Sequence, residues 1–200
     1  MSIGFVLGNG KSRESITLPS LKKFGKLYAC NAVYREFEPD YLIAVDAKMV
    51  HEINLNQYQL KGEVWTNYNK TYEKYIRFNY FEPSRGWSSG PTALDLASKH
   101  EHQSIYILGF DYQGVGELHT KVNNIYAGTA NYKKITDNAT YYGNWLRQTT
   151  TVIQQHSKIR YIRVTDNSTN FIPDQLKNFK NLSHISVNDF KKSFNILGIS

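Results

Sequence analysis

The chain has 200 residues, of which 40% are hydrophobic and 14% aromatic, and its formal net charge is +7 at pH 7. This length suits a single domain, and no apolar run is long enough to cross a membrane. Neither a signal peptide nor an internal disulfide is expected, because the N-terminus already has the pattern of a strand and Cys30 is the only cysteine.

Charge and cysteine usage bound the partners and the compartment. A lone cysteine fits a reducing environment, so a cytoplasmic location is expected. The positive charge favours an anionic partner, either a nucleotide phosphate or nucleic acid. Because Lys and Arg are scattered along the chain, we expect a nucleotide or sugar nucleotide rather than nucleic acid. An oligomer is compatible with the sequence.

Short apolar runs recur along the chain at the spacing of strands that alternate with helices or long loops. The predicted strands are Ile3–Leu7, Leu27–Cys30, Tyr41–Val45, Val64–Thr66, Tyr75–Phe78, Ile105–Leu108 and Ile159–Val164. The predicted helices are Ala47–Ile53, Gly90–Lys99 and Thr140–His156, with a further terminal helix over Phe190–Leu197. A final strand or docking segment is indicated by Phe179, Leu182, Ile185 and Val187.

The strand-like runs do not alternate cleanly between apolar and polar residues, which is typical of strands covered on both faces. We therefore predict an α/β fold with a mostly parallel, doubly wound, Rossmann-like sheet and Ile3–Leu7 at its centre. Residues 1–165 would form the nucleotide-binding domain. Residues 166–200 would form a small C-terminal segment that packs on it.

The first strand ends at Gly8-Asn9-Gly10, followed by Lys11 and Ser12. Glycines permit a tight turn and let a ligand approach the backbone closely. In open α/β sheets this turn is where phosphates bind. The pattern is neither G-x-G-x-x-G nor a Walker loop, so a simple strand terminator is the alternative interpretation.

Polar residues of one chemical type follow most of the predicted strands. They are Asn9, Asn31, Asp46, Asn67 and Asp111. Each alone is more often a turn former, but the carboxyl ends of parallel strands meet at one edge of a sheet. Together they predict a single ligand cleft. Ser89-Gly90 opens a predicted helix and adds either an anion site or an ordinary N-cap, and Lys11 and Arg85 are candidate phosphate contacts.

Five short motifs occur in the same order as in a known family and cover roughly the first 115 residues: Gly8–Ser12, Cys30–Tyr34, Asn67–Asn69, Ser89-Gly90 and Ile107–Tyr112. On these residues the chain resembles the bacterial sialyltransferases that cap lipooligosaccharide. It is more loosely similar to the motility accessory factor glycosyltransferases and to archaeal hydroxymethylpterin pyrophosphokinases.

The resemblance implies a sialyltransferase-like glycosyltransferase that binds a CMP-sugar type of nucleotide and transfers the sugar to a glycan acceptor hydroxyl, without a metal or other cofactor. The implied substrate-binding residues are Gly8, Asn9, Gly10, Ser12, Asn31, Asp46, Asn67, Ser89, Gly90 and Asp111. Tyr112 would hydrogen-bond the departing phosphate as charge develops.

The family's catalytic histidine has no counterpart here, because residues 131–137 contain no His. His119 is the replacement that we predict as acceptor base, and a solvated surface histidine is the alternative. Asp137 and Tyr141 are weaker substitutes. Two other functions stay open: a pterin-type pyrophosphokinase with Mg²⁺ held by Asp46 and Asp111, and a non-catalytic nucleotide-binding protein.

Overall fold

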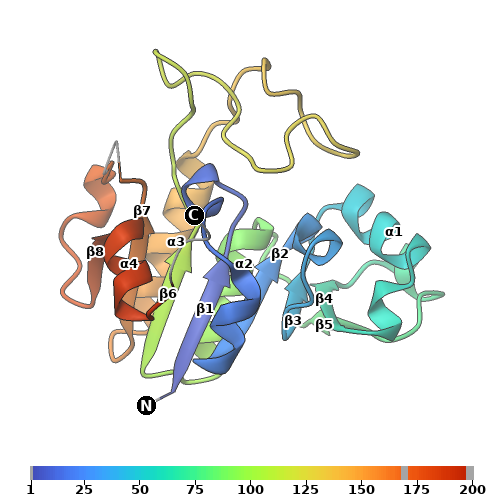
Figure 1. The fold of residues 1–200 in the computed structure, drawn as a ribbon. Coiled ribbons are helices and arrows are strands. Elements are labelled where there is room, and N and C mark those ends of the chain that lie inside the picture. The colour runs from blue at the N-terminus through green and yellow to red at the C-terminus, as the bar shows by residue number, and fades with distance from the viewer. Residues whose placement is uncertain (1, 168–170, 197–200) are drawn as a thin grey trace.

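The computed structural model describes residues 2–167 and 171–196, and its strands form one eight-stranded sheet (Figure 1). The strands are β1 (Ile3–Leu7), β2 (Lys26–Cys30), β3 (Tyr41–Ile43), β4 (Glu63–Asn67), β5 (Phe78–Phe81), β6 (Ser104–Leu108), β7 (Arg160–Thr165) and β8 (Leu182–Ser186). Their order is β5-β4-β3-β2-β1-β6-β7-β8, and every neighbouring pair is parallel. The predicted doubly wound α/β sheet with a central first strand is confirmed.

Helices cover both faces of this sheet. They are α1 (Ala47–Leu55), α2 (Ser89–Lys99), α3 (Gly143–Gln155) and α4 (Val187–Ser193). One core cluster contains residues of α2 and α3, and the other contains residues of α1 and α4. In β1, Phe5 and Leu7 belong to the second of these clusters and Val6 to the first, and all three are fully buried. Covering on both faces explains why the apolar runs do not alternate.

The strand predicted at Tyr75–Phe78 is wrong in position, because β5 begins only at Phe78. The Tyr75 amide donates to the Tyr72 carbonyl at 2.7 Å, and the two rings stack. An aromatic turn can thus have the amino-acid composition of a strand without adopting the extended backbone conformation of one. The helix predicted from Thr140 begins at Gly143. At the C-terminus, α4 ends at Ser193, and Leu197 lies outside the described residues.

The switch point of the sheet lies between β1 and β6, because strands β2 to β5 are added on one side of β1 and strands β6 to β8 on the other. From β1 the chain builds β2 to β5 on one side, then returns to pair β6 with β1. Residues 109–142 connect β6 to α3 and run above the carboxyl ends of the strands (Figure 1). In doubly wound sheets such a switch point is the usual place for a ligand.

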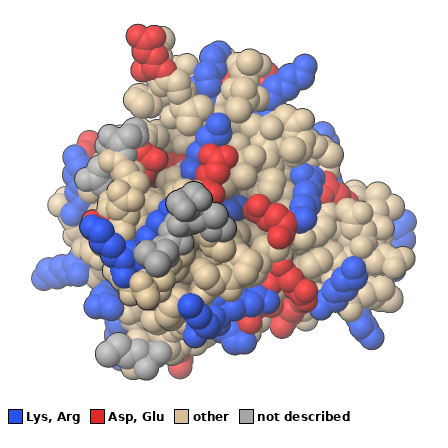
Figure 2. Space-filling model, viewed as in Figure 1, with Lys and Arg blue, Asp and Glu red and all other residues tan. Residues whose placement is uncertain are grey.

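The positive charge of the chain does not gather in one place. Figure 2 shows Lys and Arg interspersed with Asp and Glu over the visible face. Within the described part of the chain, the helices are all too short or too polar to span a bilayer.

Candidate functional site

Two turns press against each other at the switch point. The Gly8 amide donates to the Leu108 carbonyl at 2.8 Å, and the Gly10 amide donates to the Gly109 carbonyl at 2.9 Å. A Cβ atom on Gly8 would lie 2.6 Å from the Gly109 oxygen, and one on Gly10 would lie 2.5 Å from Asp111 Oδ2. Glycine is therefore required here by the approach of the neighbouring loop.

Asp111 fixes the rest of this turn. Its carboxylate accepts hydrogen bonds from the Ser12 hydroxyl, from the Ser12 amide at 3.1 Å and from Asn123 Nδ2 at 2.9 Å. Asn123 Oδ1 in turn accepts from the Lys11 amide at 2.9 Å. The amides of Gly8, Gly10, Lys11 and Ser12 thus all have partners inside the protein. They do not form the open phosphate cradle expected from the sequence.

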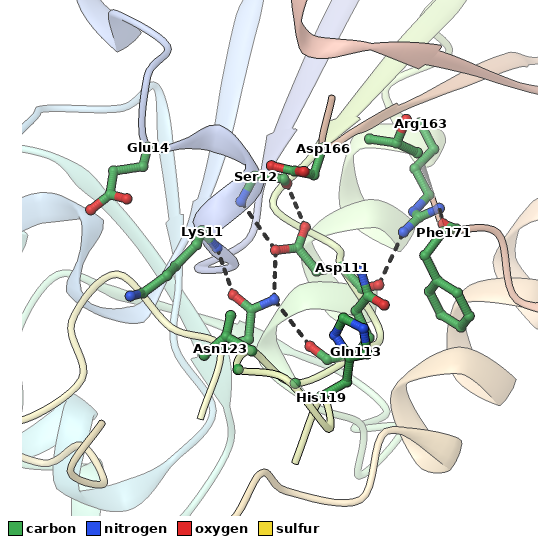
Figure 3. Close-up of a pocket in the computed structure, with 14 residues that line it drawn as sticks. Lys11, Ser12, Glu14, Asp111, Gln113, His119, Asn123, Arg163, Asp166 and Phe171 are labelled. Carbon is green, nitrogen blue, oxygen red and sulfur yellow. Dashed lines mark hydrogen bonds between the residues drawn. The ribbon is translucent and has the colours of Figure 1, made fainter. Parts of the chain in front are cut away.

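A cleft of about 320 Å³ opens beside this turn (Figure 3). This volume is at the small end of the range for ligand pockets. Its lining comes from the β1 turn, from the start of the β6–α3 connection and from the end of β7. The polar and aromatic side chains that line it are Lys11, Ser12, Glu14, Asp111, Gln113, His119, Asn123, Arg163, Thr165, Asp166 and Phe171. We call it the switch-point cleft.

Arg163 forms one wall of the cleft, and only 3% of it is exposed. Its guanidinium donates to the carbonyls of Phe110 at 2.8 Å, Phe171 at 2.8 Å and Asp111 at 3.1 Å. Burial lowers the pKa of Arg163 from its ordinary value, and the nearby Tyr112 and Asp111 act in the opposite direction. An arginine still keeps its charge at neutral pH, so a cation lies in this wall.

A second polar group lies at the carboxyl ends of the strands, and we call Asn9, Asn31 and Ser89 the asparagine cluster. Ser89 Oγ donates to Asn31 Oδ1 at 2.9 Å and accepts from the Val45 amide at 3.1 Å. Asn9 Nδ2 donates to the hydroxyl of Tyr132 at 3.2 Å. The Ser89 contacts connect the ends of β2 and β3 with the start of α2, and the Asn9 contact connects the end of β1 with the β6–α3 connection.

The structure brings the predicted site residues together in two groups rather than one. Gly8, Gly10, Ser12, Asp111 and His119 lie at the switch-point cleft; Asn9, Asn31, Ser89 and Gly90 lie at the asparagine cluster or next to it. Asp46 is exposed at the start of α1, and Asn67 ends β4. No hydrogen bond links either of these two side chains to the groups among the described residues. Contact of any of these residues with a ligand stays a prediction.

Tyr112 points away from the cleft. Its hydroxyl donates to Thr149 Oγ1 at 2.7 Å in the interior, and burial raises its pKa. The arrangement therefore gives no support to a phosphate contact from Tyr112. His119 is exposed and lines the switch-point cleft together with Asp111, but Asn31 is not among the residues that line this cleft.

Sequence reasoning missed most of the polar and aromatic side chains that line the cleft, and two of them, Arg163 and Asp166, carried a usable signal. Arg163 lies inside a predicted apolar strand, where a charged residue needs an explanation. Asp166 directly follows that strand, as Asp111 follows β6. Asn123 and Phe171 lie in irregular segments that give no such signal. Arg85, expected near a phosphate, instead lies 4.6 Å above the Trp87 ring and 3.5 Å from Asp95.

Among the described residues, no three His, Cys, Asp or Glu side chains are grouped so that they could hold a metal ion.

No family model and no curated protein matches the chain. A solved structure that does match is the crystal structure of a candidate NADH-flavin reductase from Streptococcus pneumoniae TIGR4, which is 15% identical. The match covers 98% of this chain and 91% of that chain, with a TM-score of 0.28.

That protein is described as a candidate NADH-flavin reductase and not as a glycosyltransferase, so the match gives no support to the predicted function. The prediction of a sialyltransferase-like glycosyltransferase is therefore corrected, whereas nothing here tests its pyrophosphokinase and non-catalytic nucleotide-binding alternatives. The structure adds a physical reason, because the amides of the glycine turn are occupied and Tyr112 is directed into the core. The TM-score is too low to carry an argument for a reductase.

Proposed function

We propose that the switch-point cleft binds a phosphorylated small molecule with several hydroxyl groups, and that a nucleotide is the class that fits best. The observation that carries this proposal is the presence of two cations among the side chains that line the cleft, beside the carboxylates of Glu14, Asp111 and Asp166. Lys11 and Arg163 both line it, and neither makes an ion pair within residues 2–167 and 171–196. Two such cations attract a phosphate.

The remaining lining suits the other parts of a nucleotide. Asp111 and Asp166 supply carboxylate oxygens, which accept hydrogen bonds from ribose hydroxyls. Phe171 is 38% exposed beside the cleft, and its ring offers an apolar surface for a base. Because the backbone amides of the turn are occupied, side chains would hold the phosphate. Binding should therefore weaken as the salt concentration rises.

Titration calorimetry at low salt with AMP, CMP, GMP and UMP, each compared with its nucleoside, tests this proposal. We expect at least one nucleotide to bind and its nucleoside to bind more weakly, because the nucleoside lacks the phosphate. Lys11→Ala should weaken nucleotide binding by about tenfold, the loss of roughly 1.4 kcal/mol that one charged contact supplies.

Lys48→Ala is the matched control, because Lys48 is an exposed lysine of α1 away from the cleft lining. It should bind like the unaltered protein. Equal affinities for nucleotide and nucleoside, or full affinity in Lys11→Ala, would contradict the proposal.

A further inference from the structure

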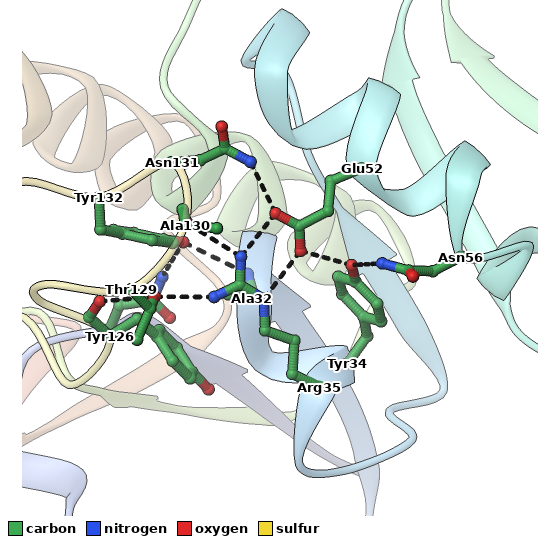
Figure 4. Close-up of polar contacts among 11 residues, drawn as sticks. Ala32, Tyr34, Arg35, Glu52, Asn56, Tyr126, Thr129, Ala130, Asn131 and Tyr132 are labelled. Carbon is green, nitrogen blue, oxygen red and sulfur yellow. Dashed lines mark hydrogen bonds and ion pairs between the residues drawn. The ribbon is translucent and has the colours of Figure 1, made fainter.

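Residues 126–132 of the β6–α3 connection are tied to two other parts of the chain (Figure 4). Arg35 Nη1 donates to Thr129 Oγ1 at 2.8 Å, and Arg35 Nη2 donates to the Ala130 carbonyl at 3.0 Å. Asn131 Nδ2 donates to Glu52 Oε2 at 2.6 Å. We call residues 126–132 the latch segment.

All three latch contacts converge on one ion pair. Arg35 follows β2, and Glu52 lies on α1. Glu52 accepts two hydrogen bonds from Arg35, at 2.8 Å and 2.5 Å, and a third from the Tyr34 hydroxyl at 2.6 Å. The pair is partly shielded from water, with 24% of the Arg35 side chain and 15% of the Glu52 side chain exposed. A forked, partly buried pair of this kind is stronger and more directional than a typical surface salt bridge.

The latch segment also takes up hydrogen-bond donors that belong to the asparagine cluster and its surroundings. The Tyr132 hydroxyl accepts from Asn9 Nδ2 at 3.2 Å and from the Ala32 amide at 3.4 Å. Asn9 Oδ1 is buried and has no hydrogen-bond partner among the described residues. A buried polar atom without a partner is costly, so the closed arrangement leaves the Asn9 carboxamide only half satisfied.

The latch segment has an anchored end and a compact turn. The Tyr126 hydroxyl accepts from Arg13 Nη2 at 3.1 Å and donates to Glu36. Gly128, with a φ of +81°, donates its amide to the Lys133 carbonyl at 2.8 Å. Tyr126 therefore anchors the first residue of the latch segment, and the hydrogen bond between Gly128 and Lys133 closes the turn that follows.

We propose that the latch segment is a gate over the asparagine cluster, with the Tyr132 hydroxyl in the place of a ligand oxygen and the Arg35–Glu52 pair holding the gate closed. The ligand oxygen would be that of a phosphate or carboxylate, because the two donors at this place require an acceptor. This inference rests on the proposed function for the identity of the ligand, since Asn9 and Lys11 belong to the same turn.

Hydrogen exchange of the full chain without any ligand tests the gate by itself. In Glu52→Gln, peptides covering residues 126–134 and 31–35 should exchange about tenfold faster, because charge-assisted hydrogen bonds to the latch segment are lost. Peptides from β6 should not change. Lys177→Ala, which removes an exposed ion pair elsewhere, is the control and should leave both regions unchanged. Unaltered exchange in Glu52→Gln, or equal acceleration in β6, would overturn the gate.

A second arm uses inorganic phosphate as the probe in a thermal-shift titration. Tyr132→Phe keeps the ring and removes the hydroxyl that accepts from Asn9 Nδ2 and from the Ala32 amide. The apparent Kd of this variant for phosphate should therefore be at least about threefold lower than that of the unaltered protein. An unchanged Kd would overturn the gate. Loss of nucleotide binding in Lys11→Ala concerns the cleft alone, so the two proposals can fail separately.

Discussion

Asp111 holds together two turns that are about one hundred positions apart in the sequence. A strand-end carboxylate can be recognised from sequence, and Asp111 follows β6 at the carboxyl edge of the sheet. Its partners Ser12 and Asn123 could not be identified, because their proximity depends on the pairing of β1 with β6 and on an irregular connection. An acid that looks like a ligand contact thus also organises the loops around the ligand site.

Asp111→Asn should lower the free energy of unfolding by about 2 kcal/mol, since hydrogen bonds to a charged group contribute about 1.5 to 3 kcal/mol each and the amide can keep only some of them. Urea denaturation followed by circular dichroism measures this loss. Asp174→Asn removes an exposed carboxylate and should leave the free energy of unfolding nearly unchanged. A comparable loss in both variants would contradict the organising role of Asp111.

His102 makes folding sensitive to acid. Tyr28 Oη lies 2.8 Å from His102 Nε2 and 2.6 Å from His100 Nδ1, at the amino ends of the strands. Burial, with a smaller contribution from His100, lowers the pKa of His102 from 6.5. The unfolded chain therefore binds a proton more readily than the folded one. Stability should be complete above pH 6.5 and fall as the pH decreases through that value.

Urea unfolding between about pH 7.5 and 5.5 checks this sign, because the two protonation states of the unfolded histidine interconvert in that range. His102→Gln should flatten the decline without abolishing it, because burial also lowers the pKa of His184. A slope that is the same in both proteins would show that His102 does not contribute.

At the scale of elements, sequence predicted strands best where burial is strongest. The bounds of β1 were predicted to the residue, since its apolar run is bounded by a glycine turn. The predicted position of β5 begins three residues too early, because the aromatic turn at Tyr72 and Tyr75 has the composition of a strand. Residues 109–142 have no periodicity, so neither the latch contacts nor the position of Asn123 could be predicted.

Arg163 joins β7 to the turn after β6 and to Phe171. Arg163→Lys keeps the charge but cannot reach three carbonyls with its single ammonium group in the same geometry. We expect the free energy of unfolding to fall by about 2 kcal/mol, as buried carbonyls lose their donors. Arg160→Lys is a matched control on the same strand, because Arg160 is exposed. A smaller effect at position 163 than at 160 would refute this expectation.

At the scale of the whole molecule, stability depends on a central strand buried on both faces. Phe5 is 0% exposed and lies among Tyr106, Phe190 and Phe194. Phe5→Ala should cost about 3 to 5 kcal/mol, from lost burial and the cavity left behind. Leu55→Ala, at a position 80% exposed, should change stability by less than about 0.5 kcal/mol. Calorimetric unfolding distinguishes these values, and a small loss for Phe5→Ala would contradict the assigned core.

The doubly wound topology also fixes where a ligand can be bound, because all the strands are parallel and their carboxyl ends share one edge. The edge of the sheet that binds a ligand could be predicted from the order of the strands and from the polar residues that follow them in the sequence. The division of this edge into a cleft and a covered asparagine cluster could not, since it depends on how residues 109–142 fold back over the sheet.

Chemical-shift mapping of backbone amides during a titration with the best-binding nucleotide shows directly whether the switch-point cleft is the binding site. We predict saturable shifts at Lys11, Ser12, Asp111, Asn123 and Asp166, which surround the switch-point cleft. Amides at the opposite edge of the sheet, around His100 and His102, should not respond. Shifts concentrated at that opposite edge, or no saturable shifts at the cleft, would contradict the claim.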